Sequence, residues 1–131
     1  MIRAFCRPGI DSIAIVEPTF SAYAQFARVQ GAAVITARLA EDFAFDADAV
    51  LTAIGTAVPK LLFLCTPNNP TGGEVDPADI ERIAAALPDT LIVVDEAYGE
   101  FAAAPSLAPR ATGNLLVLRT LSKAYGLAGA R

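Results

Sequence analysis

Lys123 lies in a part of the chain where a primary amine could do chemistry. It follows the apolar run 115–118, and its segment also holds hydroxyls at Thr120 and Ser122 and a guanidinium at Arg131. An amine in such a place can form an imine with an aldehyde. Most lysines are solvated surface residues, so the neighbouring segments must show whether this one is different.

Two other apolar runs also end in polar side chains. Run 61–65 leads into the sequence TPNNPTG at 66–72, which presents Asn68 and Asn69 on a turn rich in proline and glycine. Run 91–94 leads into Asp95, and the phenol of Tyr98 follows three residues later. Taken separately, an Asn-Pro turn and a carboxylate that caps the next helix would explain both segments.

Taken together, the three segments point to one ligand. Ligands of open parallel sheets bind outside the carboxyl ends of the strands, so these amine, carboxylate, phenol, amide and guanidinium groups would share one crevice. They are the groups that the cofactor pyridoxal phosphate needs. The amine of Lys123 would bind its aldehyde, and the carboxylate of Asp95 would hold its pyridine nitrogen protonated.

The remaining polar groups fit the other parts of this cofactor. Tyr98 and Asn69 can both hydrogen-bond to its phenolic oxygen, which would tune the imine. The phosphate would be bound by the two hydroxyls and the guanidinium of the last segment, which belong to Thr120, Ser122 and Arg131. A hydrogen bond to a charged group of this kind contributes about 1.5–3 kcal/mol.

The elements that must position these residues can be predicted from hydrophobic patterning. Five nearly continuous apolar runs are typical of strands covered on both faces, at 12–16, 33–37, 61–65, 91–94 and 115–118. Helical patterns lie between them at 19–30, 47–54 and 76–87, the last with Asp76 as N-cap and Pro77 in its first turn. This alternation predicts an α/β fold with a mostly parallel sheet and helices on both faces, a three-layer sandwich.

Composition excludes several other classes of function. The net charge of −4 and the lack of a basic cluster argue against nucleic acid as a partner. The absence of histidine removes Ser-His-Asp and Cys-His nucleophiles, and Cys6 and Cys65 lack the spacing of metal ligands. No apolar stretch is long enough for a membrane span, so we expect a soluble, cytoplasmic protein without a metal site.

Three sequence strings resemble motifs of the class I/II aminotransferases of fold type I, and most of all those of the histidinol-phosphate aminotransferases among them. They are TPNNPTG at 66–72, VVDEAYGEF at 93–101 and RTLSKAYGLAGAR at 119–131. The resemblance covers essentially the whole chain, and it implies the same roles for the residues discussed above. It also implies that Phe20 stacks on the pyridine face of the cofactor. A phenylalanine that packs in the core at the start of a helix would give the same sequence pattern. Cis peptide bonds are expected at Glu17–Pro18 and Asn69–Pro70.

The resemblance implies a ping-pong transamination. Histidinol phosphate would give its amino group to 2-oxoglutarate through the cofactor, forming imidazole-acetol phosphate and glutamate in histidine biosynthesis. Lys123 would move the proton, and the enzyme would be a homodimer. Residues 1–131 would form the central part of the large, cofactor-binding domain, without the family's N-terminal arm and C-terminal small domain.

Other functions remain open at this point. An aromatic-amino-acid aminotransferase or a threonine-phosphate decarboxylase would share this core, because the residues that determine substrate specificity in the family lie mostly in segments outside this sequence. The chain could also be a ligand-sensing domain of an aminotransferase-like regulator, against which its acidic balance weighs. The simplest alternative is a non-catalytic fragment with exposed apolar surface.

Overall fold

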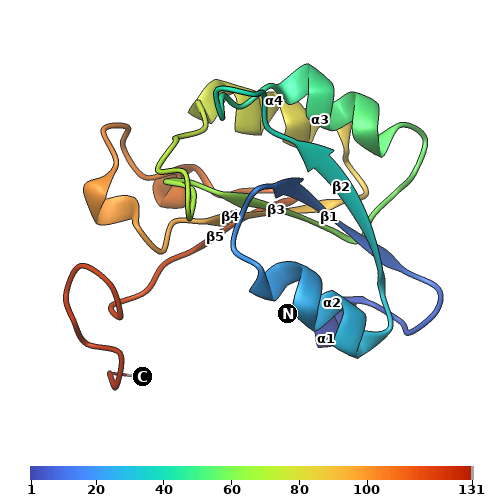
Figure 1. The fold of residues 1–131 in the computed structure, drawn as a ribbon, viewed down its shortest axis with the longest axis horizontal. Helices are drawn as coiled ribbons and strands as arrows, with labels where there is room; N and C mark the ends of the chain where they lie inside the picture. The colour runs from blue at the N-terminus through green and yellow to red at the C-terminus, as the bar shows by residue number, and fades with distance from the viewer. Residues whose placement is uncertain (131) are drawn as a thin grey trace.

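The fold is built on one parallel sheet. The computed structural model describes residues 1–130. All five predicted strands are present, as β1 (Ser12–Glu17), β2 (Ala33–Arg38), β3 (Leu61–Cys65), β4 (Leu91–Asp95) and β5 (Leu115–Leu118). Every neighbouring pair is parallel, in the order β2-β1-β3-β4-β5 (Figure 1). The predicted parallel α/β sheet is therefore confirmed.

The helices cover both faces of the sheet. They are α1 (Ile2–Phe5), α2 (Ala22–Gln30), α3 (Ala47–Ile54) and α4 (Pro77–Ala86), with short 3₁₀ turns at Gly99–Phe101 and Ala108–Arg110. Figure 1 shows α3 and α4 above the sheet and α1 and α2 below it. The predicted three-layer arrangement is confirmed.

The helix ends follow from local chemistry. The side chains of Asp46 and Asp76 accept hydrogen bonds from the first backbone N–H groups of α3 and α4, as their N-cap positions predict. Helix α2 ends at Gly31, whose φ of 75° is easily adopted by glycine. The predicted start of this helix at Thr19 was wrong. Thr19 donates its hydroxyl hydrogen bond to Asn68, so residues 19–21 form the turn that connects β1 to α2.

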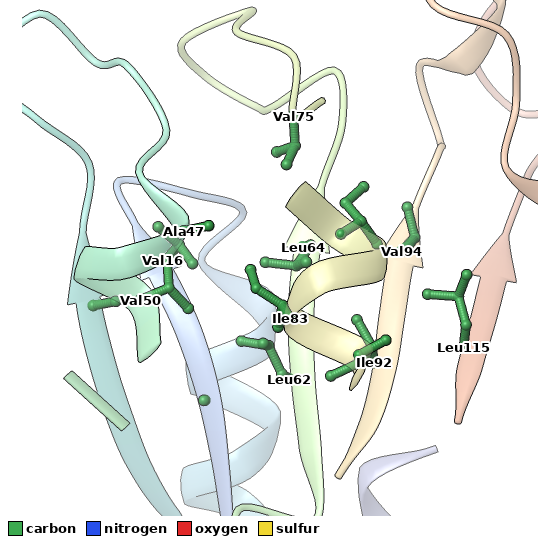
Figure 2. Packing of buried hydrophobic residues seen from close by; sticks show 14 of the residues in the cluster. Val16, Ala47, Val50, Leu62, Leu64, Val75, Ile83, Ile92, Val94 and Leu115 are labelled. Atoms are coloured by element: carbon green, nitrogen blue, oxygen red, sulfur yellow. The ribbon is translucent and has the colours of Figure 1, made fainter. Parts of the chain in front are cut away.

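Alternate strand residues fill the two cores. On one face, Leu62, Leu64, Ile92 and Val94 pack under α3 and α4, as Figure 2 shows. On the other face a second cluster, which includes Phe63 and Val93, packs against α1 and α2. These central strands are buried on both sides, which explains why their sequences are continuously apolar. Among residues 1–130, no helix has the length and hydrophobicity needed to cross a membrane.

The connections place polar loops at one edge of the sheet. The chain leaves β1 toward β2 on one side and then returns to β3 on the other, so the strand order reverses between β1 and β3. Such a reversal opens a crevice beyond the carboxyl ends of the strands. The loops after β1, β3, β4 and β5 all lie at this edge. The peptide bonds Glu17–Pro18 and Asn69–Pro70 are cis, as expected, and Thr66–Pro67 is cis as well.

Candidate cofactor site

A small pocket lies at the carboxyl edge of the sheet. It contains five of the predicted site residues, which come from four different loops. Its lining consists of Phe20, Tyr23, Cys65, Asn69, Asp95, Ala97, Tyr98 and Lys123. The cavity volume is about 50 Å³, whereas pockets that enclose a small ligand usually measure about 300–1,000 Å³. Residues 1–130 therefore form an open, shallow pocket here rather than an enclosed cavity.

Lys123 reaches this pocket from the loop after β5. Its side chain is exposed, and the Nζ atom lies 5.2 Å from the centre of the Tyr98 ring. This distance is within the range of a cation–π contact. The loop is turned back by backbone hydrogen bonds from Leu127 to Leu121 and from Gly126 to Lys123. The amine is thus accessible and lies beside the phenol that the sequence pairs with it.

Asp95, the last residue of β4, is held by two hydrogen bonds. Its Oδ2 atom accepts one from the hydroxyl of Tyr23 at 2.5 Å, and its Oδ1 atom accepts one from the backbone N–H of Ala97 at 3.0 Å. The carboxylate is half-buried and faces the pocket. Each carboxylate oxygen can accept a second hydrogen bond, so the group can still bind a cationic N–H.

Tyr23 is a site residue that sequence reasoning missed. It lies on the buried side of α2, and its ring stacks on Phe63 with centroids 4.7 Å apart. Burial, together with the hydrogen bond to Asp95, raises the pKa of Tyr23 well above its ordinary value, so the hydroxyl stays a donor. Burial likewise raises the pKa of the neighbouring Cys65 thiol. A tyrosine on an apolar helix face was the available signal, because a buried phenol needs a hydrogen-bond partner.

The two adjacent asparagines have different roles. Asn68 connects two loops: its Oδ1 atom accepts from Thr19, and its Nδ2 atom donates to the carbonyl of Pro18 and to the hydroxyl of Thr71. Asn69 instead lines the pocket, and its side chain makes no hydrogen bond to another residue among 1–130. The amide of Asn69 is therefore available to a ligand.

Phe20 forms an aromatic wall of the pocket. Its side chain is 45% exposed, and its ring meets that of Tyr23 edge to face at 5.5 Å and 88°. Phe20 is therefore a surface ring at the pocket rather than a core phenylalanine. Contact with a planar ligand would remove this apolar surface from water.

Thr120 and Ser122, two of the residues predicted to bind the phosphate, do not line this pocket. Thr120 and Ser122 hydrogen-bond to each other, with 2.9 Å between their hydroxyl oxygens, and the Ser122 N–H also donates to Thr120. Thr120 lines a separate open hollow of about 460 Å³ together with Arg119 and Tyr125. Arg131 lies outside the described residues. The structure thus brings together the residues predicted for the ring and the aldehyde, and it places Thr120 and Ser122 outside their pocket.

A second buried carboxylate, Glu96, was also missed. It accepts hydrogen bonds from the Ser106 hydroxyl at 2.5 Å and from the Leu107 N–H at 2.8 Å. The guanidinium of Arg119 lies 3.8 Å from it and pairs with Glu100 at 2.7 Å. Glu96 therefore holds the segment at Ser106 and Leu107 and does not line the pocket.

The fold and this pocket define an α/β protein with a pocket at the carboxyl edge of a parallel sheet, containing an accessible amine and an oriented carboxylate. Comparison with known proteins gives the same class more specifically. The family model for aminotransferase class I and II matches residues 1–131. The chain belongs to the class I and II aminotransferase family.

The similar proteins found by comparison are particular aminotransferases of this family. The histidinol-phosphate aminotransferase of Shewanella oneidensis is 50% identical over 133 residues, which cover 100% of this chain and 33% of that protein. A crystal structure of histidinol-phosphate aminotransferase from Sinorhizobium meliloti in complex with pyridoxal-5'-phosphate has 32% identity and a TM-score of 0.83 over 99% of this chain and 36% of that one. The aromatic aminotransferase of Pyrococcus horikoshii has 26% identity and a TM-score of 0.83, over 99% and 37%. The chain spans about a third of the length of the curated relatives it matches.

Proposed function

We propose that this chain forms the cofactor-binding core of a pyridoxal-phosphate-dependent aminotransferase. The observation that carries the proposal is the meeting of Lys123, Asp95, Tyr98, Asn69 and Phe20 in one pocket, from loops far apart in the sequence. An accessible amine, a carboxylate with free acceptor capacity and an exposed ring are what the cofactor's aldehyde, ring nitrogen and ring face require. The residues present therefore fit this cofactor.

Each residue has a definite task in this proposal. Pyridoxal phosphate, when bound, supplies an aldehyde that captures amines and a ring that withdraws electrons from the substrate's α-carbon. Lys123 binds the aldehyde and, once released by the amino donor, carries the proton to and from that α-carbon. Asp95 favours the protonated ring nitrogen because an adjacent anion stabilises the cation.

The other side chains bind and orient. Tyr98 and Asn69 hydrogen-bond to the phenolic oxygen, and Phe20 covers one face of the ring. The segment after β5 is proposed to bind the phosphate through Thr120, Ser122 and Arg131. Thr120 donates its hydroxyl hydrogen bond to Ser122, so Thr120 would have to give up this bond to donate to phosphate, whereas the Ser122 hydroxyl still has its own donor.

The proposed substrates follow from the relatives. Their 42–50% identity to this chain favours histidinol phosphate as amino donor, with 2-oxoglutarate as acceptor and imidazole-acetol phosphate and glutamate as products. We further propose a cytoplasmic homodimer, in which the partner subunit and the segments outside this chain would complete the pocket. Aromatic amino acids are the second candidate donors, because the aromatic aminotransferase of Pyrococcus horikoshii shares this fold closely.

A cofactor titration tests the binding step. Adding pyridoxal phosphate to the purified chain should produce a saturable visible absorbance band. Lys123→Ala should abolish the band, whereas Lys60→Ala should retain it. The chain has only these two lysines, and Lys60 is an exposed residue at the opposite, amino end of β3, which makes it a matched control. Equal bands in the two variants would contradict the proposal.

A single-turnover assay tests the reaction. With histidinol phosphate and no acceptor, the loaded protein should release one equivalent of imidazole-acetol phosphate per site, and 2-oxoglutarate should restore turnover. Greater product formation from phenylalanine would favour the aromatic alternative. Carbon dioxide release from threonine phosphate without keto product would instead indicate a decarboxylase and refute the proposed transamination.

A further inference from the structure

We infer that Tyr23 is a positioning residue, which holds the Asp95 carboxylate in the orientation needed to bind the cofactor's ring nitrogen. The inference rests on the proposed function, because it concerns the same pocket. It adds a residue that none of the recognised sequence motifs contains. The key contact is the 2.5 Å hydrogen bond from the Tyr23 hydroxyl to Oδ2 of Asp95, which joins residues 72 positions apart.

This contact separates Asp95 from an ordinary capping aspartate. The bond from the Ala97 N–H to Oδ1 is local, and an aspartate that only closes a turn would make it too. The bond from Tyr23 comes from the helix after β1, on the other side of β3. With one oxygen held by each donor, the carboxylate cannot rotate freely about its χ angles. Its remaining acceptor positions are thus fixed relative to the pocket.

The packing around Tyr23 makes it a rigid support. Its side chain is 6% exposed, its ring stacks on Phe63 and the edge of Phe20 contacts it. Phe63 lies in β3 and is itself buried, so the phenol is fixed to the sheet rather than to a mobile loop. Through Phe20, the same ring also borders the wall proposed to cover the cofactor's face. One side chain thereby supports two groups of the site.

Removal of the hydroxyl alone tests the inference. Tyr23→Phe keeps the stacked ring but deletes the donor to Asp95. The dissociation constant for pyridoxal phosphate should rise roughly tenfold, as expected for loss of a hydrogen bond to a charged group. Thr52→Val removes a hydroxyl from an exposed residue of α3, on the other face of the sheet, and should leave the dissociation constant unchanged. Thermal unfolding followed by circular dichroism checks that both variants are folded.

A second ligand distinguishes positioning from general support of the fold. In an analogue of pyridoxal phosphate with carbon in place of the ring nitrogen, there is no N–H for Asp95 to bind. Tyr23→Phe should therefore change the affinity for this analogue less than about twofold. Equal weakening for both ligands would show a merely structural role and overturn the inference. In the Asp95→Asn background, Tyr23→Phe should have almost no further effect on pyridoxal phosphate binding.

The outcomes separate the inference from the proposed function. If the wild-type chain binds pyridoxal phosphate and Tyr23→Phe binds it equally well, the inference is wrong and the proposed function stands. If the wild-type chain shows no saturable binding of the cofactor, both fall. A selective loss for the ligand that carries the ring nitrogen supports both.

Discussion

Asn68 and Asn69 provide a sharp test, because the structure gives adjacent residues of one type opposite roles. We predict that Asn68→Ala destabilises the fold, whereas Asn69→Ala weakens cofactor binding with little effect on stability. The Asn68 side chain makes three hydrogen bonds of 2.8–2.9 Å: those with Thr19 and Pro18 join the loops after β1 and β3, and the one to Thr71 lies within the second loop. The side chain of Asn69 makes none with another residue among 1–130 and lines the pocket.

The magnitude follows from these contacts. A neutral hydrogen bond contributes about 1 kcal/mol net, so three would give about 3 kcal/mol. The bond to the Pro18 carbonyl is exposed, and water can replace it in the variant. The free energy of unfolding should therefore fall by about 2 kcal/mol in Asn68→Ala, which corresponds to a decrease in Tm of roughly 6 °C for a chain of this size. Asn69→Ala should remain within about 0.5 kcal/mol of wild type.

Urea denaturation followed by far-ultraviolet circular dichroism measures the stability difference, and a cofactor titration measures binding. The slope of the free energy with urea should be unchanged, because neither substitution alters the surface buried in the core. Equal destabilisation by the two substitutions would refute the assignment of roles. So would a stable Asn68→Ala variant, since the connection between the loops would then contribute nothing.

Three further substitutions have predictable effects on stability. Hydrogen bonds from Arg7 hold the pKa of Asp11 well below its usual range, so the stability that the ionised Asp11 contributes is present above about pH 4 and is lost on acidification. Asp11→Asn should therefore lower Tm at neutral pH and reduce the fall in Tm at acid pH. Folding raises the pKa of Tyr23, so ionisation of this phenol favours the unfolded chain above about pH 10, and stability is lost there. Tyr23→Phe should therefore reduce the fall in Tm at alkaline pH. The two N–H donors of the Asn114 amide are shared among three carbonyl oxygens at and just beyond the end of α4, and Asn114→Ala should lower the free energy of unfolding by about 2 kcal/mol in urea denaturation.

Much of this architecture could be predicted from the sequence because the central strands are buried on both faces. Burial of that kind requires continuous apolar runs, and two of the helices between them, α3 and α4, begin at the aspartate caps Asp46 and Asp76. Parallel strands then bring their carboxyl ends to one edge, so the residues after each run could be assigned to one pocket. This reasoning correctly grouped Asp95 with Lys123.

The parts that could not be predicted depend on contacts between distant segments. No local pattern indicates that Tyr23 bonds to a residue 72 positions away, or that Asn68 rather than Asn69 connects two loops. The conformation of the loop after β5 could not be predicted from the sequence pattern either, because the pattern does not show that Thr120 hydrogen-bonds to Ser122. The roles of two adjacent residues of similar chemistry can thus be distinguished only from the residues that they contact in the folded structure.

Reductive trapping tests the central claim most directly. Borohydride treatment of the chain with pyridoxal phosphate would fix the cofactor to the amine that holds it, and mass spectrometry of the peptides would identify that amine. We expect one label on the peptide that contains Lys123 and none on Lys60, with loss of the label in Lys123→Ala. Equal labelling of Lys60 and Lys123, or no labelling of Lys123, would contradict it.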